Sequence, residues 1–296
     1  RLRSDVPVGV CLSGGLDSSI IAALMSGLSP RRVKTFSIGF HEKKFSELSY
    51  ARTIAKLYKT DHHEAYVKPD IRAILDDYIW TLDQPFSDSS SVATYYLARM
   101  ARQSVTVALN GDGGDENFGG YQRYQAFYLN TLLSRMRLNN IPLSRLFAPG
   151  ASLLPHGRDT KSLRVKMIKF LHTLAFAESP VEQYNEWFCV FTPAERNALL
   201  TEMNTKDASV PLAETFSRAA GADALSQIMS TDIETYLPDD LMYKIDSMTM
   251  AHSLEARSPF LDHQLVEFAA GIPSHLKIGL FGTKMILKEA FSPEVP

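Results

Sequence analysis

The sequence has little of three things that would point to particular classes of protein. Its two cysteines, Cys11 and Cys189, form neither a disulfide framework nor a C-x-x-C pair, which suits a reducing cytoplasm. No apolar run reaches the ~18–20 residues that span a membrane. A net charge of −2 leaves no broad basic surface, so nucleic acid is not an expected partner. We therefore expect a cytoplasmic globular protein that binds any anion at a local site and not through its overall charge.

The first part of the chain alternates short β-rich runs with helical stretches. Residues 8–12, 33–40, 62–67 and 105–109 are predicted strands, and the segments between them have helical spacing. This alternation predicts an α/β fold with a parallel sheet that is covered by helices on both faces. In such sheets ligands bind beyond the carboxyl ends of the strands.

Beyond residue 120 the strand signals fade and the pattern becomes helical. Residues 223–237 and 238–254 are predicted helices, as are several stretches between 167 and 200. Residues 139–162 are rich in Pro, Gly and Ser, which is typical of a connecting segment.

The first predicted strand runs into the turn SGGLDSS at residues 13–19. Its glycines let the backbone approach a ligand closely, and the N–H groups of the following helix face the turn. The lysine of a Walker loop is absent. Asp17 would repel phosphate unless Mg²⁺ lies between them. The turn therefore predicts a metal-bridged polyphosphate site, and an ordinary turn in which Asp and Ser cap the helix is the alternative.

A second turn, LNGDGGDENFGGY at residues 109–121, follows the last predicted strand and combines three acids with five glycines. Crowded carboxylates such as Asp112, Asp115 and Glu116 resist full ionisation unless a cation joins them. Mg²⁺ or an amino group would satisfy that need. The residue order of a calcium loop is not met, and an acidic surface turn is the other alternative.

The turn SGGLDSS after an apolar strand resembles the pyrophosphate loop of the N-type ATP pyrophosphatases. Members of that superfamily split ATP into AMP and pyrophosphate, and the loop takes the β- and γ-phosphates. The resemblance explains the missing Walker lysine, because this is a different phosphate loop.

Five segments narrow the resemblance. In chain order they are FSIGF, YARTIAKLYKTDHHE, LNGDGGDENFGGY, YLPDDLMYKIDSMTMAHSLEARSPFLDH and LKIGLFGTKMILKEAF. They are similar to segments of the synthetase domain of glutamine-dependent asparagine synthetases. The resemblance implies an adenine nucleotide alpha hydrolase-like core at residues 1–125, with a five-stranded type of parallel sheet. A mainly helical part, residues 126–296, would complete the domain.

The resemblance also implies which residues bind the nucleotide. Ile38 would lie beside the adenine, and Asn110 and Gly111 would close the other side. Asp17 and Asp115 would hold Mg²⁺ and pyrophosphate. The turn after the first strand would supply the remaining nucleotide contacts, from Leu12, Ser13, Gly14, Gly15, Ser18 and Ser19.

The second turn would carry the chemistry. Asp112 stands where asparagine synthetases often have Glu, and it is the expected catalytic residue in forming aspartyl-AMP and in handling the ammonia proton. Asp115 and Glu116 are expected to receive the amino group of the substrate. Asn110 stands where Ser is common.

The implied cofactors and partners follow from the same resemblance. ATP and Mg²⁺ are the expected cofactors, and aspartate, or a related carboxylic acid, and ammonia are the expected substrates. In the full-length protein a glutaminase domain would supply the ammonia, and we expect that this chain is a fragment without it. A homodimer stays open.

The last part of the chain leaves several basic and acidic residues without an assigned role. The family continues with a basic R-x-K-x-G-F stretch that we do not find here, and neither Lys284 nor Lys288 is expected to replace its lysine. A second group comprises Lys244, Asp246, Glu255 and Arg257. For this group a buried ion-pair network and direct contact with the ATP site both remain open.

Three alternative functions are kept. The domain could amidate another carboxylic acid or close a ring, as relatives in the family do. It could be a more distant ATP pyrophosphatase, such as a GMP, NAD or argininosuccinate synthetase. It could also be an ATP-binding regulatory domain without turnover.

Overall fold

The computed structural model describes residues 1–40, 47–67, 71–135, 209–280 and 282–296, together with residues 181, 184, 185, 187, 198 and 199. The chain divides into two compact units. Unit 1 comprises Arg1–Phe118, Thr235–Ile272 and Lys284–Pro296. Unit 2 comprises Gly119–Glu234 and Pro273–Thr283. The expected connection at 139–162 lies outside the described residues. Of the stretch between 167 and 200, where helices were expected, only the six single residues named above are described.

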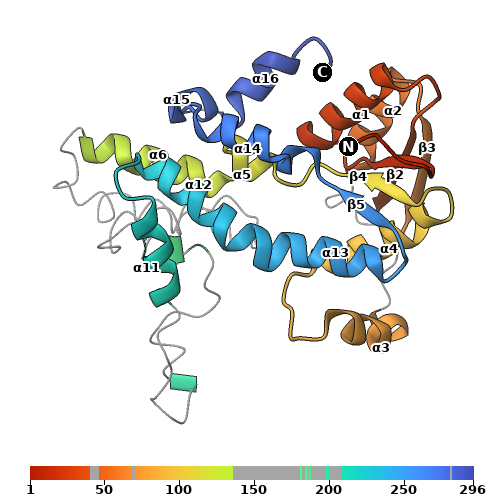
Figure 1. Ribbon diagram of the computed structural model, residues 1–296, viewed down its shortest axis with the longest axis horizontal. Coiled ribbons are helices and arrows are strands. Elements are labelled where there is room, and N and C mark those ends of the chain that lie inside the picture. Colours follow the sequence, from red (N-terminus) through yellow and green to blue (C-terminus); the bar gives the residue numbers. More distant parts are fainter. Residues whose placement is uncertain are drawn as a thin grey trace, which may run out of the picture. The chain divides into compact units, whose positions relative to one another are not determined.

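Unit 1 is built on a five-stranded sheet with the order β3-β2-β1-β4-β5 (Figure 1). The strands are β1 (Val8–Cys11), β2 (Lys34–Gly39), β3 (Asp61–Tyr66), β4 (Val107–Leu109) and β5 (Glu255–Arg257). All four pairings are parallel. The α/β fold with a parallel sheet is therefore confirmed. The fifth strand comes from a segment about 145 residues beyond β4, which its sequence does not reveal.

Each face of the sheet buries alternate residues, as the two-residue repeat of a strand requires. Val10, Leu12 and Leu109 pack in one apolar cluster with residues of α1 (Leu16–Leu28) and α2 (Leu48–Leu57). Phe36 and Ala108 pack in another cluster with residues of α4 (Ser90–Arg102). Helices therefore cover both faces, and the carboxyl ends of β1 and β4 are free to carry loops.

The other helices of unit 1 are α3 (Ile71–Leu82), α5 (Gly114–Phe118), α13 (Tyr243–Met250), α14 (His263–Ala270) and α16 (Met285–Phe291), with a short 3-10 turn at Pro259–Leu261. A π-helical stretch, η3 (Leu237–Met242), leads directly into α13. π-Helical turns are rare, and they are frequent at functional sites.

The described residues of unit 2 are mainly helical, which agrees with the helical part expected after the sheet. It contains α6 (Gln122–Arg135), α11 (Ser209–Arg218), α12 (Ala224–Glu234) and α15 (Ser274–Lys277). Asp232 of α12 is fully buried. It accepts hydrogen bonds from the guanidinium of Arg123 and from the hydroxyls of Tyr124 and Tyr184. Burying a carboxylate is costly without such partners, so this network fixes α6 against α12.

Gly14, just before α1, and Gly27, within α1, give a matched test of backbone constraint. Gly14 has a φ of +87°, and a Cβ there would lie 2.5 Å from the backbone nitrogen of Ala51. Gly27 lies in α1 with open space around it. We expect Gly14→Ala to lower the free energy of unfolding by about 2 kcal/mol or more. Gly27→Ala should raise it by about 0.5–1 kcal/mol.

Chemical denaturation of both variants measures this difference. Equal effects of the two substitutions would contradict the conformation described for the turn after β1.

Candidate functional site

The turn after β1 is held in shape by its own serines. The Ser18 hydroxyl lies 2.9 Å from the Ser13 hydroxyl and donates to the carbonyl oxygen of Gly15 at 3.2 Å. The N–H group of Ser13 also donates to Ser18 Oγ. Gly15 is the N-cap residue of α1, and it has no side chain that could cap the helix. The turn therefore presents the N-terminal N–H groups of α1 at the carboxyl edge of the sheet.

The turn after β4 packs closely against the turn after β1. A Cβ on Gly111 would lie 2.8 Å from the backbone nitrogen of Ser18, and one on Gly114 would lie 2.5 Å from the Asp17 carboxyl carbon. Only glycine permits these approaches. Two of the glycines that the sequence places among the acids therefore bring the second turn next to Asp17.

A buried lysine joins the two turns. Lys284 Nζ donates to Asp17 and lies 2.7 Å from Asp115 Oδ1. Lys284 is buried, with only 7% of its surface exposed. Lys284 also has a left-handed φ of 52° at the start of α16, a backbone strain that proteins keep mainly at functional sites. The sequence alone indicates no role for this lysine, whereas the structure places it between the two expected ligands of Mg²⁺ and pyrophosphate.

The charges in this cluster influence one another. Burial raises the pKa of Asp17, although the Lys284 ammonium opposes that shift. Burial lowers the pKa of Lys284, but the two carboxylates outweigh it and hold that pKa above its usual value. At neutral pH the lysine is therefore a fixed cation at the place where a polyphosphate would lie.

The residues also fit a phosphate-bound Mg²⁺. Asp17 Oδ1 is buried without a hydrogen-bond partner in the described part of the chain. Within the same described residues no group of three or more His, Cys, Asp or Glu side chains could form a complete metal site. Mg²⁺ at a phosphate needs only one or two carboxylates, because phosphate oxygens and water supply the other ligands. Asp17 and Asp115 meet that requirement.

Asp112 lies in the same turn, between two groups of charges. Burial raises its pKa to about 6, Lys244 opposes the shift, and Asp17 and Asp115 add to it. A carboxyl group with this pKa changes its protonation near neutral pH. It is therefore suited to accept or donate a proton.

Lys244 of α13, the cation that opposes the raised pKa of Asp112, is itself held by polar contacts. Lys244 Nζ donates to Asp88 Oδ2 at 2.6 Å and to Ser90 Oγ at 2.9 Å. Burial alone would raise the pKa of Asp88, but the hydrogen bonds from Lys244 and Ser90 hold it below its usual range. The ion pair ties α13 to the start of α4.

The four residues left open in the sequence analysis do not form one network. Arg257 donates to Glu255 and to the backbone carbonyl oxygens of Arg1 and Arg3. Asp246 is exposed. Lys244 alone of the four influences the pKa of Asp112.

The remaining expected site residues lie around these turns. Ile38 is near the carboxyl end of β2 and half-buried. The Leu12 side chain is in the core, and its backbone N–H and C=O are bonded to β2. Glu116 is 1% exposed, and Ser19 Oγ is buried without a hydrogen-bond partner among the described residues. The nucleotide, metal and substrate roles of all these residues stay predictions.

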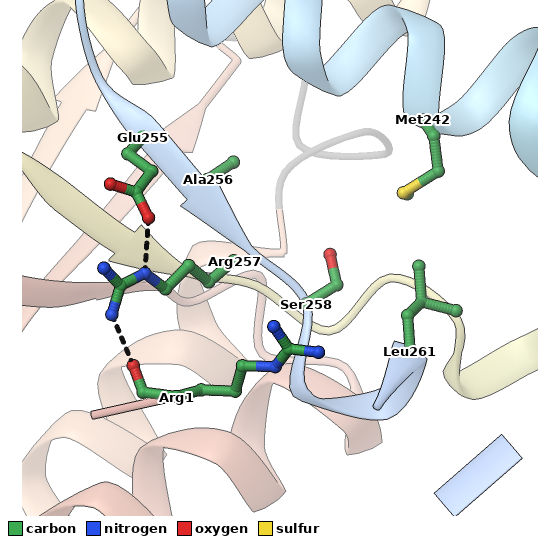
Figure 2. Close-up of a pocket in the computed structure, with 7 residues that line it drawn as sticks. All are labelled: Arg1, Met242, Glu255, Ala256, Arg257, Ser258 and Leu261. Carbon is green, nitrogen blue, oxygen red and sulfur yellow. Dashed lines mark hydrogen bonds and ion pairs between the residues drawn. The ribbon is translucent and has the colours of Figure 1, made fainter. Parts of the chain in front are cut away.

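A cavity of about 630 Å³ lies beside β5 (Figure 2). Figure 2 shows Arg257 reaching from β5 to Glu255 and Arg1 along its wall. Ser258, also in the lining, donates a hydrogen bond of 2.6 Å to Asn110 Oδ1. The cavity therefore adjoins the turn that carries Asp112.

The fold and the site together define an α/β protein with a glycine-rich phosphate-type turn and a second, acidic turn joined to it by a lysine. The family model described as "Asparagine synthase" matches residues 1–296. The chain therefore belongs to the asparagine synthase family. No helix in the described residues is long and apolar enough to cross a membrane.

Three relatives illustrate the family. Asparagine synthetase [glutamine-hydrolyzing] 1 of Bacillus subtilis is 33% identical over 300 residues, which is 100% of this chain and 45% of that protein. Putative asparagine synthetase [glutamine-hydrolyzing] 2 of Methanocaldococcus jannaschii is 48% identical over 126 residues, or 42% of this chain and 24% of that protein. Amidase chyE of Penicillium rubens is 26% identical over 330 residues, covering 100% of this chain and 48% of that protein. The chain spans about half the length of the curated relatives that it matches along its whole length.

The raised pKa of Asp112 makes stability depend on pH. The folded pKa of about 6 exceeds the ordinary value of 3.8, so folding favours the protonated form. The resulting stability is present below pH ~4 and is lost as the pH rises through ~6. We expect Asp112→Asn to match the unsubstituted protein near pH 4 and to be more stable by on the order of 2 kcal/mol at pH 8.

Urea denaturation at both pH values measures this difference. Asp5→Asn, at an exposed position, is the control and should leave the pH dependence unchanged. A stability difference for Asp112→Asn that is the same at both pH values would contradict the raised pKa.

Proposed function

We propose that this chain is an ATP-dependent, amide-forming synthetase domain that activates the side-chain carboxylate of aspartate. The observation that carries the proposal is the meeting of Asp17, Asp115 and Lys284 where two glycine-rich turns touch. Asp112, with a pKa of about 6, belongs to the same set of charges. Membership of the asparagine synthase family supports the reaction class.

In the first half-reaction a side-chain carboxylate oxygen of aspartate attacks the α-phosphorus of ATP. The bond between the α-phosphorus and the bridging oxygen breaks, which gives β-aspartyl-AMP and pyrophosphate. Lys284 neutralises the charge that develops on the leaving pyrophosphate, and the N–H groups at the start of α1 donate to its oxygens. A preorganised cation in a buried site stabilises such charge without reorganising water.

Asp17 and Asp115 would hold Mg²⁺, which when bound screens the phosphate oxygens from the carboxylates of the turns. The protein's own part is to hold both carboxylates next to Lys284. Asp17 Oδ1, buried and without a partner among the described residues, supports this assignment.

In the second half-reaction ammonia attacks the carbonyl carbon of the acyl adenylate. The bond from that carbon to the phosphate oxygen breaks, and AMP leaves with the electron pair. The new nitrogen loses a proton, and Asp112 accepts it. The products are asparagine and AMP.

We infer the source of the ammonia from the relatives. Several of them are named glutamine-hydrolyzing, and this chain covers only 45% of the Bacillus protein. A glutaminase domain in the full-length protein would release ammonia from glutamine.

One alternative is that the same chemistry serves another carboxylic acid. The relative named Amidase chyE carries a different name, although it matches the whole chain. Exchange of pyrophosphate into ATP tests the main proposal. Exchange that requires aspartate supports it. Exchange with another acid favours the alternative, and ATP binding without exchange favours a regulatory domain.

Lys284 and Lys288 give a matched pair for testing the phosphate end of the site. Lys284 is buried against both carboxylates, whereas Lys288 is exposed one turn later in α16. In the full-length protein, we expect Lys284→Met to lower aspartate-dependent ATP–pyrophosphate exchange by about 10²–10³-fold, the range seen when one preorganised donor is removed. Lys288→Met should stay within about twofold, as surface substitutions usually do.

Lys284→Arg keeps the charge and should retain more exchange than Lys284→Met. Thermal melts of each variant exclude unfolding as the cause. Equal exchange by the Met variants at positions 284 and 288 would contradict the role given to Lys284.

A further inference from the structure

Asp240 holds a carboxylate oxygen that the described structure leaves unsatisfied. Its Oδ1 atom is buried, and the described residues supply no hydrogen-bond partner for it. A buried acceptor without a partner costs free energy that a bound cationic group would recover. Asp240 lies in the π-helical stretch η3, one helical turn before Lys244.

The electrostatics of Asp240 connect it to the rest of the site. Burial raises its pKa, the neighbouring Asp88 charge adds to that effect, and Lys244 opposes it. Lys244 in turn lowers the pKa of Asp112. Asp240 therefore interacts electrostatically with Asp88 and Lys244, and Lys244 also interacts with Asp112.

Among the described residues, one donor of Lys244 has no hydrogen-bond acceptor. A lysine ammonium has three N–H donors. One N–H of Lys244 donates to Asp88 and another donates to Ser90. Asp88 is already satisfied, because it also accepts from the N–H and hydroxyl of Ser90. One donor of Lys244 and one oxygen of Asp240 are left to bind a ligand that carries both charges.

We propose that Asp240 and Lys244 form the subsite for the α-amino and α-carboxylate groups of the acid substrate, with Asp240 binding the ammonium group and Lys244 the carboxylate. The inference rests on the proposed function and names the residues that select an amino acid. It differs from the expectation that Asp115 and Glu116 bind the amino group. Asp115 is held by Lys284 at 2.7 Å, and Glu116 is 1% exposed.

Two truncated substrates separate the two contacts. Succinate is aspartate without its amino group, and β-alanine is aspartate without its α-carboxylate. ATP–pyrophosphate exchange in the full-length protein gives kcat/KM for all three acids. The variants are Asp240→Asn, Lys244→Met, and the control Asp239→Asn at the exposed neighbouring position of η3.

Asp240→Asn should lower kcat/KM for aspartate by about 10- to 100-fold or more, the usual loss when one partner of a buried charge pair is removed. Its kcat/KM for succinate and its KM for ATP should stay near those of the unsubstituted protein. Lys244→Met should lower kcat/KM for aspartate and succinate more than it lowers kcat/KM for β-alanine. Asp239→Asn should change none of these constants.

An unchanged preference for aspartate over succinate in Asp240→Asn would overturn the subsite. So would loss of that preference in Glu116→Gln while Asp240→Asn keeps it. Because Asn has nearly the shape of Asp, Asp240→Asn decides the question even where Lys244→Met lowers stability in a thermal melt.

Calorimetric titration with aspartate separates failure of this inference from failure of the proposed function. If the unsubstituted protein shows no aspartate-dependent exchange, the proposed function fails. Aspartate binding that is lost in Asp240→Asn still supports the subsite. Binding that is equal in both proteins, or absent from the unsubstituted protein, overturns it.

Discussion

The contact of Lys284 with Asp17 and Asp115 is the interaction on which the rest of the site depends. It joins residues from the start, the middle and the end of the chain. The two carboxylates lie close together because glycines at 111 and 114 allow the second turn to touch the first. Such closeness would be repulsive without a cation between the acids. Without Lys284 the carboxylates of the two turns would repel each other, so its ion pairs are required for the turns to lie together.

The two ion pairs also account for the strained backbone of Lys284. A left-handed conformation at a residue with a side chain costs on the order of 1 kcal/mol. A flexible surface lysine would lose that strain by changing its conformation. Lys284 keeps it because its ammonium is fixed by two carboxylates in a buried place, where loss of either contact would leave a charge unpaired.

Two lysines stand among the carboxylates of the site. Lys284 contacts Asp17 and Asp115, Lys244 interacts with Asp88 and Asp240, and Asp112 responds to Lys244, Asp17 and Asp115. Two such cations suit two anionic reactants, a polyphosphate and a carboxylic acid, which would otherwise repel each other. A carboxyl group with a pKa of about 6 takes up a proton more readily than an aspartate with the ordinary value of 3.8.

The sequence predicts those features of the fold and site that a short stretch of residues marks, and it does not predict those that depend on distant partners. The strands at β1, β2, β3 and β4 were predicted because each is an apolar or β-branched run next to a turn or a helix. β5 was not, because Glu-Ala-Arg is short and mostly polar and is a strand only through its pairing with β4. The two turns stand out through glycine and acid content. Lys284 and Asp240 carry no such signal, since their importance comes from partners that only the fold brings near.

The ion pairs of Lys284 also bear on how the site changes when ATP arrives. Phosphate oxygens would compete with Asp17 and Asp115 for the same ammonium group, and they carry more charge. Once the phosphates take that ammonium, the two carboxylates need another cation, because burial already raises the pKa of Asp17. Mg²⁺ that enters with the nucleotide would meet this need and keep the acids ionised. The ion pairs would thus hold the carboxylates in place for the metal until the nucleotide takes the lysine.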